Sequence, residues 1–168
     1  MSRRNASSQR SPASSAIDDF DHRILALYQH DTRLVAEAIG DKVGLSPASV
    51  QRRLKRLREI GVIVRETAEL NGSAVGVSVI CIVGVDLVDE RTEHIDSFKQ
   101  AMLKHRNVQQ CYYVTGEVDF VLVLTVASMN EYQALARRLF AENPNVTWFK
   151  TIVALDRVKV GFEVPSVL

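Results

Sequence analysis

Apolar residues in the N-terminal part of the chain recur at the spacing of amphipathic helices. The segment "IDDFDHRILALYQH" predicts a first helix, with three aspartates in its first turn, where carboxylates favour the positive end of the helix dipole. Its buried stripe is predicted to comprise Phe20, Ile24, Leu27 and Tyr28. A short second helix is predicted over residues 34–43, and Gly44 ends it because glycine tolerates the left-handed geometry of a helix end.

The segment "GLSPASVQRRLKRLREIGVI" predicts a third helix directly after this glycine. Ser46 is placed to cap the helix and Pro47 to occupy its first position, and the helix is predicted to run to about Ile60. The next stretch, "VIVRETAEL", predicts a strand and a turn that would form a small wing. Three short helices with a tight turn before the last are typical of a helix-turn-helix module. The N-terminal part is therefore predicted to be a winged helix-turn-helix domain.

The turn-rich stretch "LNGSAVG" separates this pattern from one that alternates strands and helices. The predicted order is a strand at 75–87, a helix at 90–105, strands at 107–116 and 119–127, a helix at 129–142 and a strand at 146–160. Strand, helix, strand, strand, helix, strand is the ferredoxin-like βαββαβ order, so the predicted fold class is α+β. The predicted domains are a flexible tail (1–16), the winged helix-turn-helix (17–66), a hinge (67–74), the ferredoxin-like effector-binding and oligomerisation domain (75–160) and a C-terminal tail (161–168).

The predicted strands are apolar on both faces. In this arrangement both helices cover the same face of the sheet, so the other face of an isolated copy should be polar. Instead, Ile80 and Ile82 alternate with Cys81 and Val83 in the first strand. A second copy packed sheet against sheet is the simplest cover, because a bare patch of that size invites association. The alternative is that the N-terminal domain folds back over this face.

Charge is distributed unevenly along the chain, whose formal net charge is only +1. Residues 46–58 hold five basic residues and no acid, so the rest of the chain is slightly acidic. A local positive patch on such a body is suited to a polyanion. No apolar run reaches the roughly 18 residues needed to cross a bilayer, and the N-terminal stretch lacks the apolar region of a secretory signal. Cys81 and Cys111 lie in apolar segments and suit reduced thiols in the cytoplasm.

A helical projection places Ser49, Arg52, Arg53 and Arg56 together, beside the buried face of the third helix. Hydroxyl and guanidinium groups are the types that bind base edges and phosphates in a major groove. A solvated charged face is the bland alternative, but the basic run lacks acidic partners at i+4 and follows a cap, a helix and a turn. The residues predicted to bind double-stranded DNA are Ser46, Pro47, Ala48, Ser49, Gln51, Arg52, Arg53 and Arg56.

Three stretches together resemble the Lrp/AsnC (leucine-responsive, feast/famine) family of transcription regulators. They are "DDFDHRIL", "VGLSPASVQRRLKRLREIGVI" and "VTGEVDFVLVLTVASMNEY". The resemblance implies dimerisation through the sheets, further assembly, often to octamers, and an effector, commonly an amino acid, bound between dimers near the loop "TGEVD". It implies effector-binding roles for Tyr113, Gly116, Glu117, Asp119, Met129 and Ile152. The family's loop usually has Asp and an aromatic residue where Glu117 and Val118 stand here, which argues against leucine or asparagine as the effector.

The sequence offers no constellation typical of an enzyme, and neither a cofactor nor a metal is predicted. His22 and His30 are about 12 Å apart along one helix, too far to share a metal. One alternative is a sirohaem-decarboxylase-like enzyme on the same fold, but such enzymes rely on His and Arg to hold tetrapyrrole carboxylates, and the basic residues here cluster on the third helix. A second alternative is a DNA-organising protein that needs no ligand.

Overall fold

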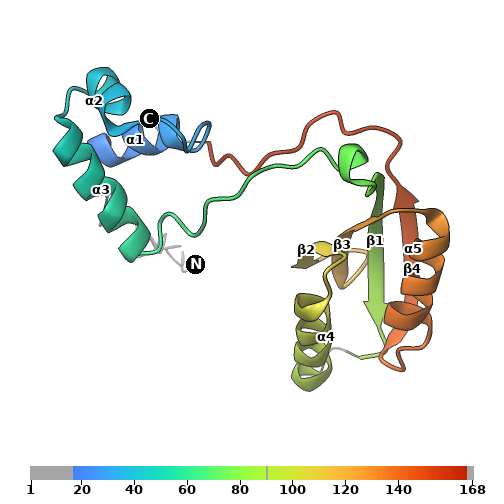
Figure 1. The fold of residues 1–168 in the computed structure, drawn as a ribbon. Coiled ribbons are helices and arrows are strands. Elements are labelled where there is room, and N and C mark those ends of the chain that lie inside the picture. The colour runs from blue at the N-terminus through green and yellow to red at the C-terminus, as the bar shows by residue number, and fades with distance from the viewer. Residues whose placement is uncertain (1–16, 90, 166–168) are drawn as a thin grey trace, which may run out of the picture. The chain divides into compact units, whose positions relative to one another are not determined.

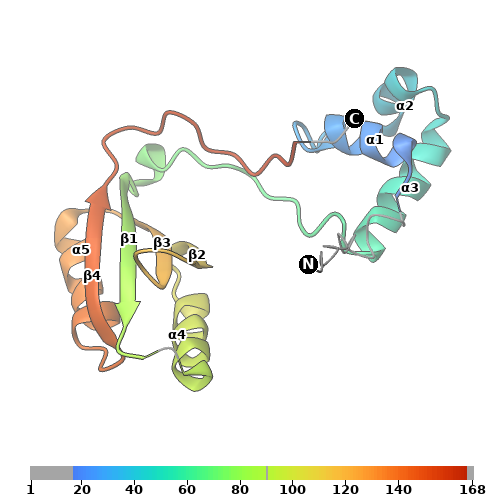
Figure 2. The same ribbon diagram turned by 180° about the vertical axis from the view of Figure 1, so that it is seen from behind.

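The computed structural model describes residues 17–89 and 91–165, and the predicted N-terminal tail lies outside them. The chain divides into two compact units (Figure 1). Within the described residues, the first unit comprises residues 17–68 together with 161–165, and the second runs from Glu69 to Val160. The chain therefore passes from the first unit to the second and back again, so that two segments link them (Figure 2).

The first unit is a bundle of three helices, α1 (Asp19–Tyr28), α2 (Ala36–Val43) and α3 (Pro47–Glu59). Its core is formed by Ile24, Tyr28, Ile39, Val43, Val50 and Leu54. The helix α3 begins as predicted, because the Ser46 side chain accepts a hydrogen bond from the Ser49 amide at 3.3 Å and Pro47 occupies the first turn. The helix-turn-helix prediction is thus confirmed at the level of its helices and of the cap.

The turn between α2 and α3 is built on two glycines. The amides of Gly44 and Leu45 both donate to the Gly40 carbonyl, at 2.8 and 3.0 Å. Gly44 adopts a φ of 78°, the left-handed conformation that ends α2. A β-carbon on Gly40 would overlap the carbonyl oxygen of Leu45. This close approach fixes the direction in which α3 leaves the turn.

Two predictions for the first unit are wrong. Phe20 was expected in the buried stripe of α1, but it is 38% exposed, and the wholly buried position one residue later is Asp21. The helix turns this way because Asp21 binds two arginines of α3. The predicted wing strand is also absent, since residues 62–70 of the described chain form no strand. Side-chain contacts hold this segment against the helices instead, because Glu66 accepts hydrogen bonds from Tyr28 of α1 and Arg58 of α3.

The second unit has the predicted ferredoxin-like topology. Its elements are β1 (Val79–Leu87), α4 (Thr92–Lys104), β2 (Val108–Tyr113), β3 (Phe120–Val126), α5 (Met129–Ala136), continued by a π-helical segment at Arg137–Ala141, and β4 (Val146–Val153). The strands form one antiparallel sheet in the order β2-β3-β1-β4. The last strand is shorter than the predicted 146–160, because β1, its only neighbour in this sheet, pairs with it no further than Val153.

The sheet has one covered face and one open face. Side chains of α4 and α5 pack with alternate strand residues, among them Val83, Leu122 and Leu124, into a single core. The intervening residues of β1, β3 and β4 point to the other face. Four large side chains there are substantially exposed, namely Ile82 (37%), Tyr112 of β2 (51%), Trp148 (46%) and Ile152 (55%). The predicted apolar character of both faces is therefore confirmed, and what covers the open face stays a prediction.

The segment after Gly161 packs on the end of α1. The Gln29 side chain donates to the carbonyl of Val164 at 3.1 Å and accepts from its amide at 3.0 Å. Beside this pair, Nδ1 of His30 lies 2.7 Å from a carboxylate oxygen of Glu163. These contacts explain why residues 161–165, predicted to be a tail, belong to the compact helical unit.

Candidate DNA interface and effector site

The N-terminal half of α3 carries most of the residues predicted to contact DNA. Ser46, Pro47, Ala48, Gln51 and Arg52 are all exposed. Ser49 is half-buried, and its hydroxyl accepts a hydrogen bond from the hydroxyl of Ser46 at 3.0 Å. These side chains stand opposite the buried stripe of α3, which packs on α1 and α2. An exposed, capped helix end of this kind is the part of a recognition helix that meets base edges.

Arg53 is held by two carboxylates of α1 and does not simply extend into solvent. Its Nη1 lies 2.8 and 2.9 Å from the two carboxylate oxygens of Asp18 and 2.9 Å from Asp21 Oδ1. Only 22% of the Arg53 side chain is exposed, and its guanidinium lies 5.5 Å from the centre of the Phe20 ring. The paired carboxylates raise the pKa of Arg53, and hydrogen bonds from the Asp21 amide and from Arg53 lower the pKa of Asp18.

Arg56 also reaches α1, where its Nη2 donates to the second carboxylate oxygen of Asp21. Asp21 thereby accepts from both arginines while its own side chain is wholly buried. The Asp18 amide donates to the same carboxylate at 3.1 Å, which completes a capping box at the start of α1. The aspartates that the sequence assigned to the helix dipole therefore also join α1 to α3.

The remaining basic residues of α3 have acidic partners as well, with one exception. Arg58 pairs with Glu66 at 2.8 Å, and Lys55 lies 3.9 Å from Glu59, which corrects the statement that the run lacks acids at i+4. Hydrogen bonds from Tyr28 and Arg58 lower the pKa of Glu66. Within the part of the chain that the structure describes, Arg52 is the basic residue of α3 for which no ion pair is found.

The structure thus separates residues that the helical projection had grouped. Arg52 is exposed, whereas Arg53 and Arg56 turn towards α1. A projection treats one helix alone, so it cannot show partners more than 30 residues away in the sequence. The signal was present in the first turn of α1, where acids stand at positions 18, 19 and 21.

The six residues predicted to bind the effector lie at two ends of the sheet. Tyr113 ends β2, and Gly116, Glu117 and Asp119 belong to the loop that leads into the start of β3. Met129 follows the other end of β3, and Ile152 is near the end of β4, which lies at that same end of the sheet. A strand of seven residues spans about 20 Å, so one chain cannot bring the two groups around one small molecule.

The loop between β2 and β3 is held by the side chain and backbone of Asp119. Its Oδ2 accepts a hydrogen bond from the Leu87 amide at 2.8 Å, and its own amide donates to the Val85 carbonyl at 3.1 Å. Gly116 takes a φ of 135°, where a side chain would be strained. One carboxylate oxygen of Asp119 therefore has a structural partner in β1, which joins the loop to the end of that strand.

The Val118 side chain of this loop lies over Gly84 on the open face of the sheet. A β-carbon built on Gly84 of β1 would lie 3.2 Å from a methyl carbon of Val118, so the valine fills the space above the glycine. On the opposite face, the ring of Tyr113 lies 5.1 Å from that of Phe120, and Nζ of Lys99 lies 5.1 Å from the Tyr113 ring. The loop region thus presents a half-exposed aromatic ring and a cation on one face, and a branched apolar side chain on the other.

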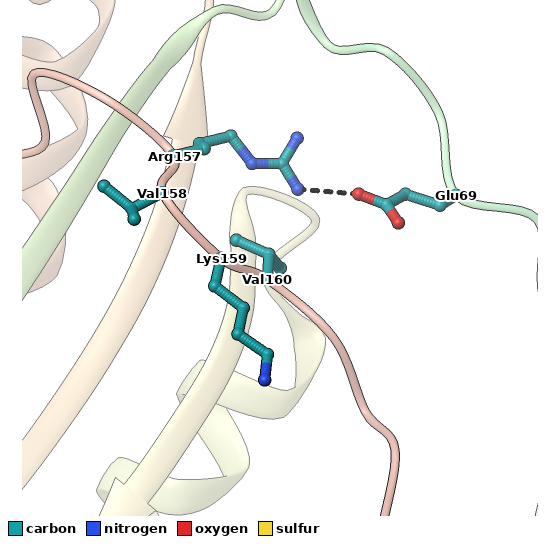
Figure 3. A pocket seen from close by; sticks show the side chains of 5 residues that line it. All are labelled: Glu69, Arg157, Val158, Lys159 and Val160. Atoms are coloured by element: carbon teal, nitrogen blue, oxygen red, sulfur yellow. Dashed lines mark hydrogen bonds and ion pairs between the residues drawn. The ribbon is translucent and has the colours of Figure 1, made fainter. Parts of the chain in front are cut away.

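The second unit also contains a hollow of about 460 Å³ that was not predicted from the sequence. Figure 3 shows its lining, Glu69 and the segment Arg157–Val160. Arg157 Nη2 donates to Glu69 Oε1 at 3.0 Å, and the Lys159 side chain points away from this pair. The hollow contains none of the predicted effector residues. In the described residues no helix has the length and apolarity needed to cross a membrane, and no group of three or more His, Cys, Asp or Glu side chains could hold a metal.

Comparison with known proteins agrees with this arrangement in both units. Residues 17–58 match an AsnC-type helix-turn-helix domain, and residues 80–164 match the Lrp/AsnC ligand binding domain. An uncharacterized HTH-type transcriptional regulator of Sinorhizobium fredii is 46% identical over 149 residues, which cover 89% of this chain and 88% of that protein. The leucine-responsive regulatory protein of Haemophilus influenzae is 32% identical over 144 residues, which cover 86% and 87%.

A solved structure gives the same result for the fold. The AsnC family transcriptional regulator of Agrobacterium tumefaciens superposes with a TM-score of 0.82 at 28% identity and covers 89% of this chain and 97% of that one. The matches extend over both units. The chain belongs to the Lrp/AsnC family of transcription regulators.

Proposed function

We propose that this protein binds specific double-stranded DNA in the cytoplasm as a homodimer that assembles further, with octamers as the expected form. The observation that carries this proposal is α3, a capped helix with one apolar face in the core and an exposed N-terminal half bearing Ser46, Ala48, Gln51 and Arg52. Side chains of this kind bind phosphates and base edges in the major groove.

The open face of the sheet supports the proposed dimer. Ile82, Trp148 and Ile152 lie on it with large exposed fractions, and a second sheet would remove this apolar surface from water. A two-fold axis through such an interface would present two copies of α3 to one duplex. Half-sites would then lie about one helical turn, roughly 34 Å, apart or a multiple of it.

A small effector, an amino acid in the proposal, modulates assembly or DNA affinity. The predicted effector residues lie at opposite ends of the sheet, so their use in one pocket requires residues from more than one copy. Such a pocket would form only in the assembly, which links binding to assembly directly. The relative from Haemophilus influenzae is named for its response to leucine. Glu117 and Val118 favour a different amino acid here, since Val118 leaves no aromatic ring at that position.

The proposal assigns no catalytic role and no cofactor. The two relatives described above are named as regulators, and no observation favours the tetrapyrrole-binding alternative. Burial raises the pKa of the thiols of Cys81 and Cys111, which works against their acting as nucleophiles. A haem-like absorbance in the purified protein would contradict this part of the proposal.

Fluorescence anisotropy at fixed salt tests the proposal. The protein is titrated into a labelled duplex from just upstream of its own coding region and into a scrambled duplex, each with and without a pool of amino acids. Tighter binding to the upstream duplex, changed by the pool, is expected. Equal binding to both at several salt concentrations would instead support the DNA-organising alternative, and binding to neither would refute a DNA-binding role.

A further inference from the structure

The five basic residues of α3 have two different kinds of surroundings, and this division points to two different roles. We propose that Asp18 and Asp21 hold Arg53 and Arg56 as positioning residues, which fix α3 on α1, and that Arg52 is the arginine of this helix that contacts DNA. The inference rests on the proposed function, because it assigns roles within the DNA interface.

The Asp21 carboxylate holds the two arginines together. Asp21 is wholly buried and binds both arginines, Arg53 at 2.9 Å. A buried charge that loses its partner is strongly destabilising, because nothing else compensates for its desolvation. If Arg53 swung away to reach a phosphate, Asp21 would lose one partner and Asp18 would lose the guanidinium that lies 2.8 Å from it. The two carboxylates therefore favour an Arg53 side chain that stays on α1.

The packing around Arg53 also restricts its side chain. Its side chain is 22% exposed, and its guanidinium lies over the ring of Phe20, which explains why this phenylalanine is not in the core. The guanidinium of Arg23 lies 5.9 Å from the centre of the same ring. Cation–π contact and two carboxylates together define one position for the Arg53 guanidinium. A side chain with that position fixed joins two helices and is not available to follow a DNA backbone.

Arg52 is the immediate neighbour of Arg53 in the sequence. It is exposed, and no ion pair holds it within the residues that the structure describes. It follows the exposed Gln51 and lies nearly two turns after the helix cap at Ser46. An unpaired guanidinium binds phosphate or guanine without first breaking an ion pair, so Arg52 is the side chain of α3 best prepared for DNA.

The two roles predict different effects on DNA binding. A lost phosphate contact reduces the slope of log K against log salt by about 0.9 for each contact, whatever the sequence of the duplex. A positioning residue contacts no phosphate, so its loss leaves that slope unchanged. Loss of a positioning residue lets α3 shift in the major groove. This shift lowers the preference of the protein for a specific DNA site, because that preference depends on the register of the base contacts.

The experiment measures binding of Arg52→Gln, Arg53→Gln and the unmodified protein to a random-sequence duplex across a salt series, and to the upstream and scrambled duplexes at fixed salt. Arg137→Gln is the matched control, since Arg137 is an exposed arginine in the other unit that pairs with Glu142 at 2.7 Å. Arg52→Gln is expected to reduce the slope by about 0.9 or more per subunit. Arg53→Gln is expected to keep the slope and lose at least about tenfold in the ratio of upstream to scrambled affinity.

An Arg53→Gln slope reduced as much as that of Arg52→Gln would overturn the inference, and so would an Arg53→Gln ratio equal to that of the control. If Arg53→Gln does not fold, arginine side-chain NMR of the unmodified protein decides the question. The Arg52 signal is expected to shift when the duplex is added and the Arg53 signal to stay, and a shifted Arg53 signal would overturn the inference. Should the unmodified protein bind no duplex, the proposed function itself fails and the inference with it, which distinguishes the two failures.

Discussion

Replacing Asp21 with alanine should destabilise the helical unit far more than replacing any exposed acid. Its carboxylate accepts hydrogen bonds from the Asp18 amide at 3.1 Å, from Arg53 at 2.9 Å and from Arg56. Removing one partner of a buried ion pair costs about 3 to 5 kcal/mol. The lower end applies here, because Arg53 and Arg56 are 22% and 42% exposed and can turn towards water once released.

A loss of about 3 kcal/mol is large for three short helices, since whole domains are stable by about 5 to 15 kcal/mol. For a unit of this size it should lower Tm by more than about 10 °C. Far-ultraviolet circular dichroism follows the helices during thermal unfolding. The single tryptophan, Trp148, lies in the sheet unit, so its fluorescence reports that unit separately and should change little.

Asp19→Ala is the control, because Asp19 occupies the same helical turn but is exposed. It should cost no more than about 0.5 kcal/mol, as exposed substitutions usually do. If Asp21→Ala and Asp19→Ala unfold at the same temperature, the carboxylate does not join the two helices, and the positioning role of Arg53 is refuted.

Four further outcomes follow from particular contacts. Asp119→Asn keeps an acceptor oxygen for the backbone amide at the end of β1, so it should fold normally and lose the response to the amino-acid pool, whereas the alanine variant should also loosen the loop, as measured by hydrogen exchange. Gly40→Ala should destabilise the helical unit by about 1 to 3 kcal/mol in urea unfolding despite alanine's better helix propensity, because its β-carbon overlaps a backbone oxygen. Ile82→Lys should yield a smaller species in sedimentation equilibrium, because a charge would enter the proposed sheet interface. The pKa values of Asp18 and Glu66 are lowered from 3.8 and 4.5, so their stabilisation should be full above about pH 4.5 and be lost progressively as the pH falls from there through the folded-state pKa values.

A specific result would contradict each of these predictions. An Asp119→Asn protein that responds normally would place the effector elsewhere, and a Gly40→Ala protein as stable as the unmodified one would mean that the turn adapts. An Ile82→Lys protein of unchanged mass would assign the interface to another surface. Stability of the helical unit that does not fall between pH 5 and pH 3 would show that these two carboxylates contribute little to it.

The elements of both units could be predicted from the sequence because their signals are local. The cap at Ser46 and the glycine at 44 depend on neighbours within one helical turn, and the apolar periodicity of α3 needs no knowledge of the rest of the chain. The wing was predicted wrongly for the same reason. Residues 62–70 have the composition of a strand, but a strand needs a partner, and the segment is held instead by the Glu66 side chain.

The roles of individual site residues could not be predicted with equal success, because they depend on contacts between distant segments. Arg52 and Arg53 are adjacent, have the same chemistry and looked equivalent in projection, yet the carboxylate that separates their roles is 32 residues away from Arg53. Asp119 was recognised as a loop residue of functional interest, while its bond to the Leu87 amide becomes visible only once β1 and β3 are paired.

Hydroxyl-radical footprinting of the DNA upstream of the coding region tests the central claim most directly, because it detects both contact and spacing. The account predicts short protected stretches that repeat about one helical turn apart, roughly 10 base pairs, or a multiple of it. The Arg52→Gln variant should weaken every protected stretch at the same protein concentration, and the Arg137→Gln control should leave all of them intact. Protection without this period, or a pattern that Arg52→Gln leaves unchanged, would contradict a dimer that reads DNA through α3.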